Sequence, residues 1–221
     1  MELKKKPQVY VMVGKPESGK SHLVKSLIYD FQKKDPYFKF ILAFVKTKFN
    51  NDYDYLPDEY VYESFDEEKL RTHIEKLREY RRKTNKPVPP NLIVFDDLLG
   101  DIDWYSPWMT NWLCSFRHTN TSIIMTAQYL MGAKSVSTCL RECTNVAFIY
   151  NSKFKNSIKA LYEAYGQLFN SYDDFVEKFQ GITKERFTCM VYDASVDELE
   201  DNYVSFKAIE NIPNFKLKYK I

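Results

Sequence analysis

The chain has 221 residues, of which 44% are hydrophobic and 28% charged, and its 32 basic and 30 acidic residues leave a formal net charge of +2. This balance is typical of a globular domain and excludes a polycation, so any contact with nucleic acid must come from a local patch. No stretch reaches the ~18 apolar residues that a membrane span needs, and no apolar signal core follows the basic start. We expect a soluble, intracellular protein with a single domain over residues 1–221.

Apolar runs and amphipathic stretches alternate along the chain. The apolar runs predict strands at 9–13, 38–45, 91–97, 122–127 and 144–150, with a closing pair at 186–193 and 203–208. Helices are predicted at 20–34, 66–83, 106–117, 154–166 and 172–180. Near-continuous apolar strands between amphipathic helices indicate an α/β fold, with a mostly parallel central sheet and helices on both faces. We expect a nucleotide-binding core over about 7–150, followed by C-terminal helices and strands over 151–221.

A phosphate-binding motif stands between the first predicted strand and the first predicted helix. Residues 14–21 read GKPESGKS and match the pattern G-x-x-x-x-G-K-[ST]. A chance Gly/Ser turn is the alternative, but the strand before the motif and the helix after it argue strongly against that. The sequence therefore predicts a P-loop NTPase fold, a three-layer sandwich of the RecA/ASCE-like type.

Each motif position has a chemical reason. Gly14 and Gly19 let successive backbone N–H groups turn toward a phosphate, Lys20 adds a positive charge, and the Ser21 hydroxyl can reach Mg²⁺. The residues predicted to contact the nucleotide are Gly14, Lys15, Pro16, Glu17, Ser18, Gly19, Lys20, Ser21 and His22. We expect ATP and Mg²⁺ as ligands.

Two carboxylates end the apolar run NLIVFDD at 91–97. Ligands of open α/β sheets bind at the carboxyl ends of the strands, so Asp96 is expected to hold Mg²⁺ together with Ser21, through a water. Asp97 is expected to orient and polarise the attacking water. A surface turn after a strand is the alternative. Paired acids favour hydrolysis over simple binding, because a switch GTPase usually positions its water with Gln.

A polar amide follows the predicted strand at 122–127, which should lie beside the first and third strands. Gln128 could contact both the γ-phosphate and the water, and so act as a sensor of hydrolysis. Alternatively, it caps the next helix.

Two arginines stand just before predicted strands. Arg117 precedes the strand at 122–127 and Arg141 precedes the strand at 144–150, which places both at the edge opposite their own nucleotide or at a subunit boundary. Either could complete the site of a neighbouring subunit as an arginine finger. Either could instead be a helix C-terminal cation that the helix dipole favours.

In this order, the motifs resemble the FtsK–HerA superfamily of ring ATPases, and within it the genome-packaging ATPases of poxviruses, giant viruses, virophages and Polintons. The resemblance spans about residues 9–150. It rests on VGKPESGKSHL, Asn51-Asp52-Tyr53, LIVFDDL, RHTNTSIIMTAQ and LRECTNVAFIY.

The resemblance implies specific roles and partners. The implied site comprises Lys20 and Ser21 on phosphate and Mg²⁺, Asp96 and Asp97 as the metal and catalytic pair, Gln128 as the sensor, and Arg117 or Arg141 as the finger. It also implies a homomeric ring, a pentamer or hexamer, that threads double-stranded DNA into a preformed capsid, with capsid proteins as partners. Several relatives carry Glu after the metal aspartate, whereas the shorter Asp97 must approach the water more closely.

Two segments are candidates for contacting DNA without reading its sequence. One is the segment 132–135. The other is a basic cluster comprising Arg78, Arg81, Arg82, Lys83 and Lys86, for which a solvated helix face is the alternative. Two other functions stay open: a nucleotide or small-molecule kinase, and a non-translocating switch in which ATP controls assembly.

Overall fold

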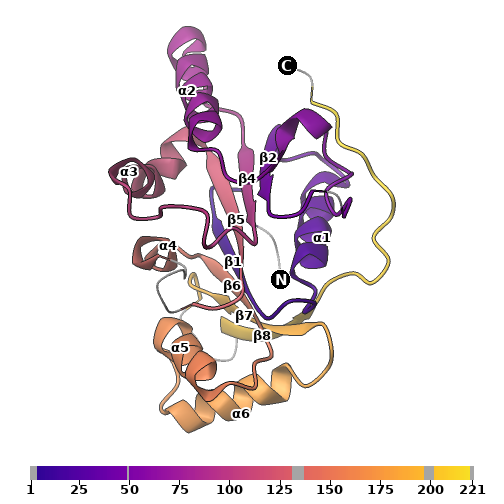
Figure 1. Ribbon diagram of the computed structural model, residues 1–221, viewed down its shortest axis with the longest axis vertical. Coiled ribbons are helices and arrows are strands. Elements are labelled where there is room, and N and C mark those ends of the chain that lie inside the picture. Colours follow the sequence, from indigo (N-terminus) through magenta and orange to yellow (C-terminus); the bar gives the residue numbers. More distant parts are fainter. Residues whose placement is uncertain (1–3, 49, 131–136, 197–201, 220–221) are drawn as a thin grey trace.

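The computed structural model describes residues 4–48, 50–130, 137–196 and 202–219. These residues form an eight-stranded sheet in the order β3-β2-β4-β5-β1-β6-β7-β8 (Figure 1). The strands are β1 Val9–Val13, β2 Phe40–Val45, β3 Val61–Glu63, β4 Asn91–Asp96, β5 Thr121–Ala127, β6 Val146–Tyr150, β7 Thr188–Asp193 and β8 Tyr203–Lys207. The helices are α1 Lys20–Gln32, α2 Glu67–Thr84, α3 Pro107–Ser115, α4 Thr138–Glu142, α5 Lys155–Tyr165 and α6 Tyr172–Ile182, with 3₁₀ turns η1 Asp58–Tyr60 and η2 Phe116–Thr119.

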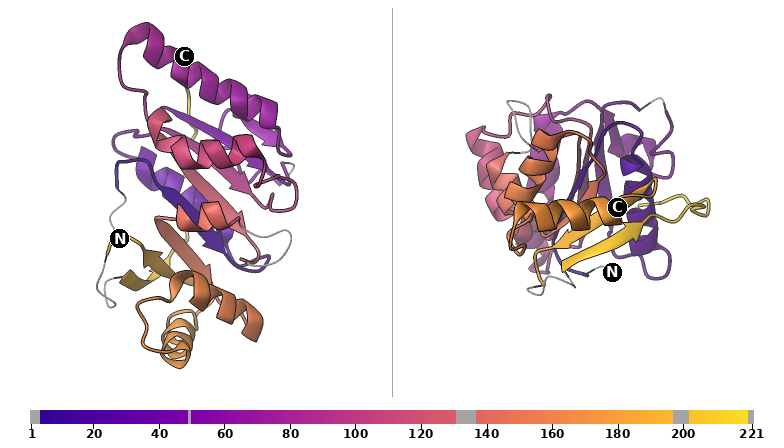
Figure 2. Two further views of the ribbon diagram at one scale, coloured as in Figure 1. Left: turned by 90° about the vertical axis from the view of Figure 1, so that its left-hand side faces the viewer. Right: turned by 90° about the horizontal axis from the view of Figure 1, so that it is seen from below.

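Helices cover both faces of the sheet (Figures 1 and 2). Alternate residues of β1 show why, because Val9 and Val11 belong to the core under α2 to α6, whereas Tyr10 and Met12 belong to the core under α1. All five residues of β1 are buried. Each large apolar side chain buried in this way contributes about 1.5–3 kcal/mol relative to exposure. The predicted fold, a mostly parallel sheet between two helical layers, is confirmed.

Strand order brings three carboxyl ends together. β5 lies between β4 and β1 and is parallel to both, with Met125 beside Phe95 and Ala127 beside Val13. The sequence predicted that the strand at 122–127 lies beside the first and third predicted strands, and this is confirmed. As a consequence, the segments that follow β1, β4 and β5 emerge at one edge of the sheet.

The last two strands differ from the rest. β7 pairs with β6 and β8 pairs with β7, both antiparallel. After β8 the chain runs without regular structure past α1 to β2, at the other end of the sheet (Figure 1). There the Leu217 N–H donates to the Tyr55 carbonyl at 2.8 Å.

Two short elements lie in segments for which the sequence predicts only connections. β3 has three residues and α4 has five, which is too few for an apolar repeat to stand out. In α4, the Ser137 side chain accepts a hydrogen bond from the Leu140 N–H and so begins the helix. Among the helices of the described ranges, none is both long enough and apolar enough to cross a membrane.

Candidate nucleotide site

The phosphate loop joins β1 to α1 and lies at the lower end of α1 in Figure 1. The Gly14 N–H donates to the carbonyl of Ala127 at 3.0 Å, which ties the loop to the end of β5. A Cβ at Gly14 would lie 2.6 Å from Ser18 Oγ and 2.8 Å from Tyr150 Cβ. Gly19 has φ +98°, which other residues rarely adopt. Gly14 is therefore required by close packing against two side chains, and Gly19 by its backbone conformation.

The amino end of α1 is open to an anion. The helices α2, α3, α4 and α6 each begin with a side chain that accepts a backbone N–H, whereas α1 begins at Gly19 without such a cap. Uncapped N–H groups and the helix dipole together attract negative charge. Ser18 Oγ is buried there, without a hydrogen-bond partner in the described structure. A buried hydroxyl is expected to be paired, and a phosphate oxygen could supply the partner.

Lys20 is folded over the loop. It is 8% exposed, and its Nζ donates to the carbonyl of Gly14 at 2.7 Å and to that of Lys15 at 3.0 Å. Burial lowers the pKa of Lys20, while the nearby Asp97 and Asp96 carboxylates oppose the shift. A phosphate would therefore stabilise the charged form of this lysine.

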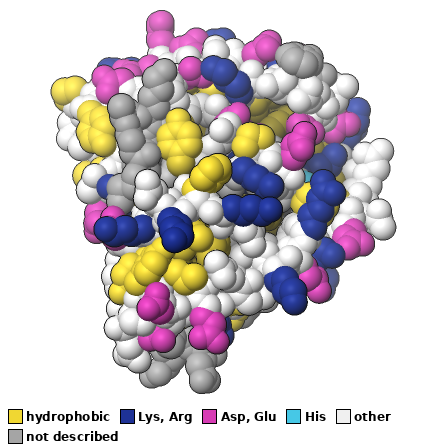
Figure 3. Space-filling model, turned by 60° about the horizontal axis from the view of Figure 1, so that its bottom comes forward, with side chains coloured by type: hydrophobic (Ala, Val, Ile, Leu, Met, Phe, Trp, Pro, Cys, Tyr) yellow, Lys and Arg dark blue, Asp and Glu magenta, His cyan; other side chains and the backbone are white. Residues whose placement is uncertain are grey.

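The remaining side chains of the motif are exposed or contact other parts of the chain. Lys15, Pro16 and Glu17 are exposed at its crest. His22 Nε2 lies 2.7 Å from the carbonyl of Ile209, so the side chain contacts the C-terminal tail. In Figure 3 the bottom of the molecule, as drawn in Figure 1, is turned forward. On this face, Lys and Arg side chains lie across the middle, and acidic ones lie mostly toward the margins.

Asp96 is the hub of the site. It is 8% exposed, and its Oδ2 accepts hydrogen bonds from Ser21 Oγ at 3.0 Å and from the Tyr53 hydroxyl at 2.9 Å. Its Oδ1 accepts a hydrogen bond from Thr126 Oγ1. Ser21 and Asp96, predicted to share Mg²⁺, are thus in direct contact.

These oxygen atoms fit a magnesium ion. Mg²⁺ prefers hard oxygen ligands, is held through one or two protein carboxylates and keeps several waters or phosphate oxygens. Within the described ranges, no group of three or more His, Cys, Asp and Glu residues forms a separate metal site. An ion held by Ser21 and Asp96 would take its other ligands from water and from the triphosphate.

Two residues of this hub were not predicted to act in it. Thr126 also accepts the Asp97 N–H at 2.9 Å, so its hydroxyl bridges the two acidic positions. Burial, and then the negative charge of Asp96, raise the pKa of Tyr53 well above its usual range, which keeps the hydroxyl protonated as a donor. In the sequence, Thr126 stands out only as a polar residue inside an apolar run. Tyr53 is one of the residues on which the family resemblance rests, but the sequence predicted no role for it.

Asp97 and Gln128 form a second pair beside the hub. Asp97 follows β4 with φ 58°, in the left-handed region. Gln128 Nε2 donates to Asp97 Oδ1 at 2.9 Å, and both residues are exposed. A carboxylate and an amide at the solvent boundary can orient a water molecule. The structure therefore brings together the loop, both aspartates and Gln128.

The two arginines have different surroundings. Arg117 lies in η2, before β5, at the edge opposite the phosphate loop, as expected. It is exposed, and its guanidinium lies 5.3 Å from the ring centroid of Phe116.

Arg141 turns back along its helix. It lies in α4, and its guanidinium donates to the carbonyl of Leu130 at 3.1 Å and to Thr138 Oγ1 at 3.0 Å. Leu130 follows β5, so the side chain reaches the segment that leaves the nucleotide edge and does not stay at the opposite one. The reason is that helical side chains lean toward the amino end of their helix.

Of the two candidate DNA-contacting segments, the structure describes only the basic cluster. Segment 132–135 lies outside the described residues. The basic cluster lies on the exposed side and just after the carboxyl end of α2, where Lys83 pairs with Glu79 at 2.7 Å. These surroundings are those of a solvated helix face, and contact between the basic cluster and DNA stays a prediction.

The family model described as Poxvirus A32 protein matches residues 1–160. The chain belongs to this family. The matched range contains the phosphate loop, Asp96, Asp97, Gln128 and both arginines. The predicted resemblance to a poxvirus family is confirmed by this match. A comparison with curated proteins gave no match.

Solved structures agree on the fold. The genome packaging NTPase B204 of Sulfolobus turreted icosahedral virus 2, in complex with AMPPCP, matches with TM-score 0.64 at 14% identity, over 94% of this chain and 100% of that chain. The cytoplasmic domain of the type VII secretion ATPase EccC of Thermomonospora curvata matches with TM-score 0.67 at 16% identity, over 97% of this chain and 28% of that chain. The pCW3 conjugation coupling protein TcpA matches with TM-score 0.59 at 13% identity, over 92% and 60%. At such identities the matches establish the P-loop ATPase fold.

Proposed function

We propose that this chain is an Mg²⁺-dependent ATPase that moves double-stranded DNA and packages a viral genome into a preformed capsid. The observation that carries the proposal is the contact at 3.0 Å between Ser21 of the phosphate loop and Asp96, beside the exposed pair of Asp97 and Gln128. This arrangement has one place for a metal–triphosphate and another for a water. Membership of the poxvirus A32 family and the fold shared with B204, a genome packaging NTPase, support it.

The residues divide the reaction among them. Lys20 and the open amino end of α1 bind the β- and γ-phosphates, and Ser21 and Asp96 hold Mg²⁺. The ion, when bound, neutralises charge that develops on the phosphate oxygens. Asp97 accepts the proton of the attacking water, and Gln128 holds that carboxylate and senses loss of the γ-phosphate. The Tyr53 hydroxyl fixes the orientation of the Asp96 carboxylate.

The proposal also includes assembly. A pentameric or hexameric ring would surround the duplex, contact its phosphates without reading sequence, and bind capsid proteins. Arg117 or Arg141 would reach the γ-phosphate of a neighbouring subunit. The place of action would be the cytoplasm or viral factory of an infected cell.

Steady-state ATP hydrolysis with and without linear double-stranded DNA, at low and moderate salt, tests the motor. We expect DNA to stimulate hydrolysis, moderate salt to weaken this stimulation, and Asp97→Ala to abolish it. A rate indifferent to DNA would overturn translocation and favour a kinase or an assembly switch.

Mixed rings test the finger. A ring that combines Arg141→Ala subunits with Lys20→Ala subunits pairs an intact loop with an intact finger across some interfaces. Recovery of hydrolysis in this mixture, but not in the matching mixture with Arg117→Ala, would assign the finger to Arg141. The reverse result would assign it to Arg117, and no recovery in either mixture would refute a finger acting between subunits.

A further inference from the structure

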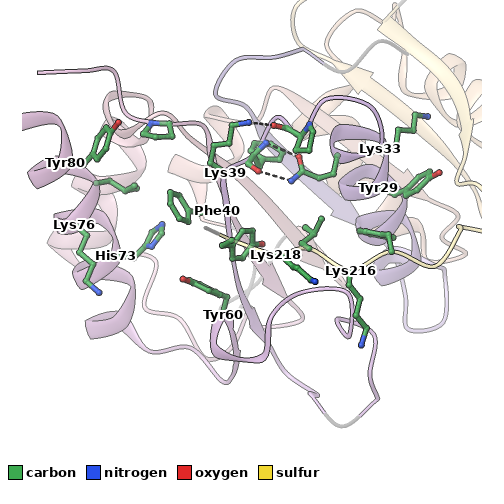
Figure 4. A pocket seen from close by; sticks show the side chains of 18 residues that line it. Tyr29, Lys33, Lys39, Phe40, Tyr60, His73, Lys76, Tyr80, Lys216 and Lys218 are labelled. Carbon is green, nitrogen blue, oxygen red and sulfur yellow. Dashed lines mark hydrogen bonds between the residues drawn. The ribbon is translucent and has the colours of Figure 1, made fainter. Parts of the chain in front are cut away.

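A groove of about 1030 Å³ opens at the edge of the sheet opposite the phosphate loop (Figure 4). Its floor is the start of β2, where Phe40 lies at the centre of the view. One wall is α2, and the other is formed by the end of α1 and the C-terminal tail, residues 215–219. The site described above uses none of these residues.

The groove is basic. Five lysines and no Asp or Glu line it: Lys33, Lys39, Lys76, Lys216 and Lys218. Lys33 pairs with Asp30 at 2.6 Å, and Lys39 donates to the carbonyl of Pro36. The other three lysines make no ion pair within the described ranges, so their charge is free to attract an anion.

Aromatic rings give the groove flat apolar surfaces. The Tyr219 ring lies 6.0 Å from that of Phe40 and 4.9 Å from that of Tyr60, measured between centroids. Tyr80 is 38% exposed and lies on the α2 wall, in the upper part of Figure 4. At the other end, the rings of Tyr29 and Phe215 are 5.4 Å apart. Rings of this kind can stack against other planar groups.

A buried nitrogen also faces this space. His73, on the α2 wall, has its Nε2 buried without a hydrogen-bond partner in the described structure. Burial lowers the pKa of His73 to about 4, so the ring is neutral at pH 7 and can exchange hydrogen bonds with a neutral polar edge. An unpaired buried nitrogen of this kind needs a water or a ligand.

We propose that this groove binds single-stranded nucleic acid, with bases against the rings of Tyr80, Phe40 and Tyr219 and phosphates against Lys76, Lys216 and Lys218. A basic groove with aromatic faces is the arrangement that binds single strands without sequence preference. A duplex fits less well, because its base faces are covered by stacking on their neighbours. The proposal goes beyond duplex packaging and needs no hydrolysis, since the groove lies at the opposite edge from Lys20.

Fluorescence anisotropy of the full chain tests the proposal. The probe is a labelled oligothymidylate of about twelve nucleotides, compared with a duplex of the same length. The single strand is expected to bind at least about tenfold more tightly, and Tyr80→Ala to weaken it roughly tenfold. The matched control is Tyr105→Ala, because Tyr105 is 70% exposed outside the groove. Equal affinity for strand and duplex, or no effect of Tyr80→Ala, would overturn the proposal.

Salt dependence separates binding from structure. The double substitution of Lys216 and Lys218 by Ala is expected to reduce the slope of log affinity against log salt by about 1.4, since each phosphate contact on a single strand contributes about 0.7. Lys178→Ala, on the exposed side of α6, should leave the slope unchanged. A purely structural role of the tail would lower thermal stability without changing this slope, and would overturn the assignment of the lysines.

Two further comparisons complete the test. Displacement of the oligonucleotide by polyglutamate at equal charge concentration would overturn the proposal in favour of an acidic peptide. Lys20→Ala and Asp97→Ala are expected to retain oligonucleotide binding while losing hydrolysis. Failure of the groove therefore leaves the proposed ATPase untouched, and failure of the ATPase leaves the groove to its own test.

Discussion

The two edges of one sheet carry opposite kinds of polar surface. At the carboxyl edge, polar groups bond one another, so that Asp96 accepts hydrogen bonds from Ser21, Tyr53 and Thr126. At the amino edge, lysines surround aromatic rings, and of these lysines only Lys33 makes an ion pair within the described ranges. The first surface is preorganised and can fix a metal and a water. The second offers positive charge and flat aromatic rings, which suit a polymer whose bases differ along the strand.

Lys20→Ala should have the largest effect and should be confined to the carboxyl edge. We expect ATP hydrolysis to fall by about 100-fold or more, because a charge placed for the phosphates is removed. Steady-state phosphate release measures this, with oligonucleotide binding in the groove as the internal control. Hydrolysis within tenfold of the unchanged protein would show that the loop lysine is dispensable.

Asp97→Asn should reduce turnover by about 100-fold while nucleotide binding is retained, since the amide keeps the shape but cannot take a proton. Its Oδ1 can still accept the hydrogen bond from Gln128. Single-turnover hydrolysis and nucleotide titration separate the two effects. Asp173→Asn, an exposed position on α6, is the matched control. A joint loss of binding and turnover would contradict the assignment of Asp97 to the water.

Thr126→Val should lower the stability of the folded protein. Thr126 is fully buried, and its hydroxyl serves both Asp96 and the Asp97 N–H. Leaving these groups without their partner costs about 1–3 kcal/mol of the free energy of unfolding. Urea denaturation measures the loss, and Thr126→Ser, which keeps the hydroxyl, should recover most of it. Equal stability of the two variants would argue against the bridge.

His73 gives the amino edge a pH dependence. Its pKa is lowered from 6.5 to about 4, chiefly by burial and also by Lys76, while the polar side chain of Asn91 opposes the shift. The folded state thus disfavours the proton: stability is complete above pH 6.5 and declines as pH falls toward 4. The difference is on the order of 3 kcal/mol. Urea unfolding of His73→Asn should lack this part of the acid-side decline, and an unchanged pH profile would contradict it.

Most elements that position the nucleotide site could be predicted from the sequence. β1 lies at 9–13 as predicted, and the loop, Asp96, Asp97 and Gln128 lie together at one edge. Each of these signals is local, because an apolar run, a glycine spacing or a polar residue after a strand can be read from neighbouring positions. The family match over residues 1–160 agrees with them.

Only the tertiary structure showed what depends on distant segments. Thr126 reaches Asp96 because β5 pairs with β4 in one particular register, and Tyr53 reaches it from a connection without a repeating pattern. The groove joins α1, β2, α2 and the tail, whose residues stand far apart in the chain. Local chemistry determined which residues could bind phosphate and metal. Strand register and the packing of remote segments decided what surrounds them, since neither is encoded by spacing within a single stretch of sequence.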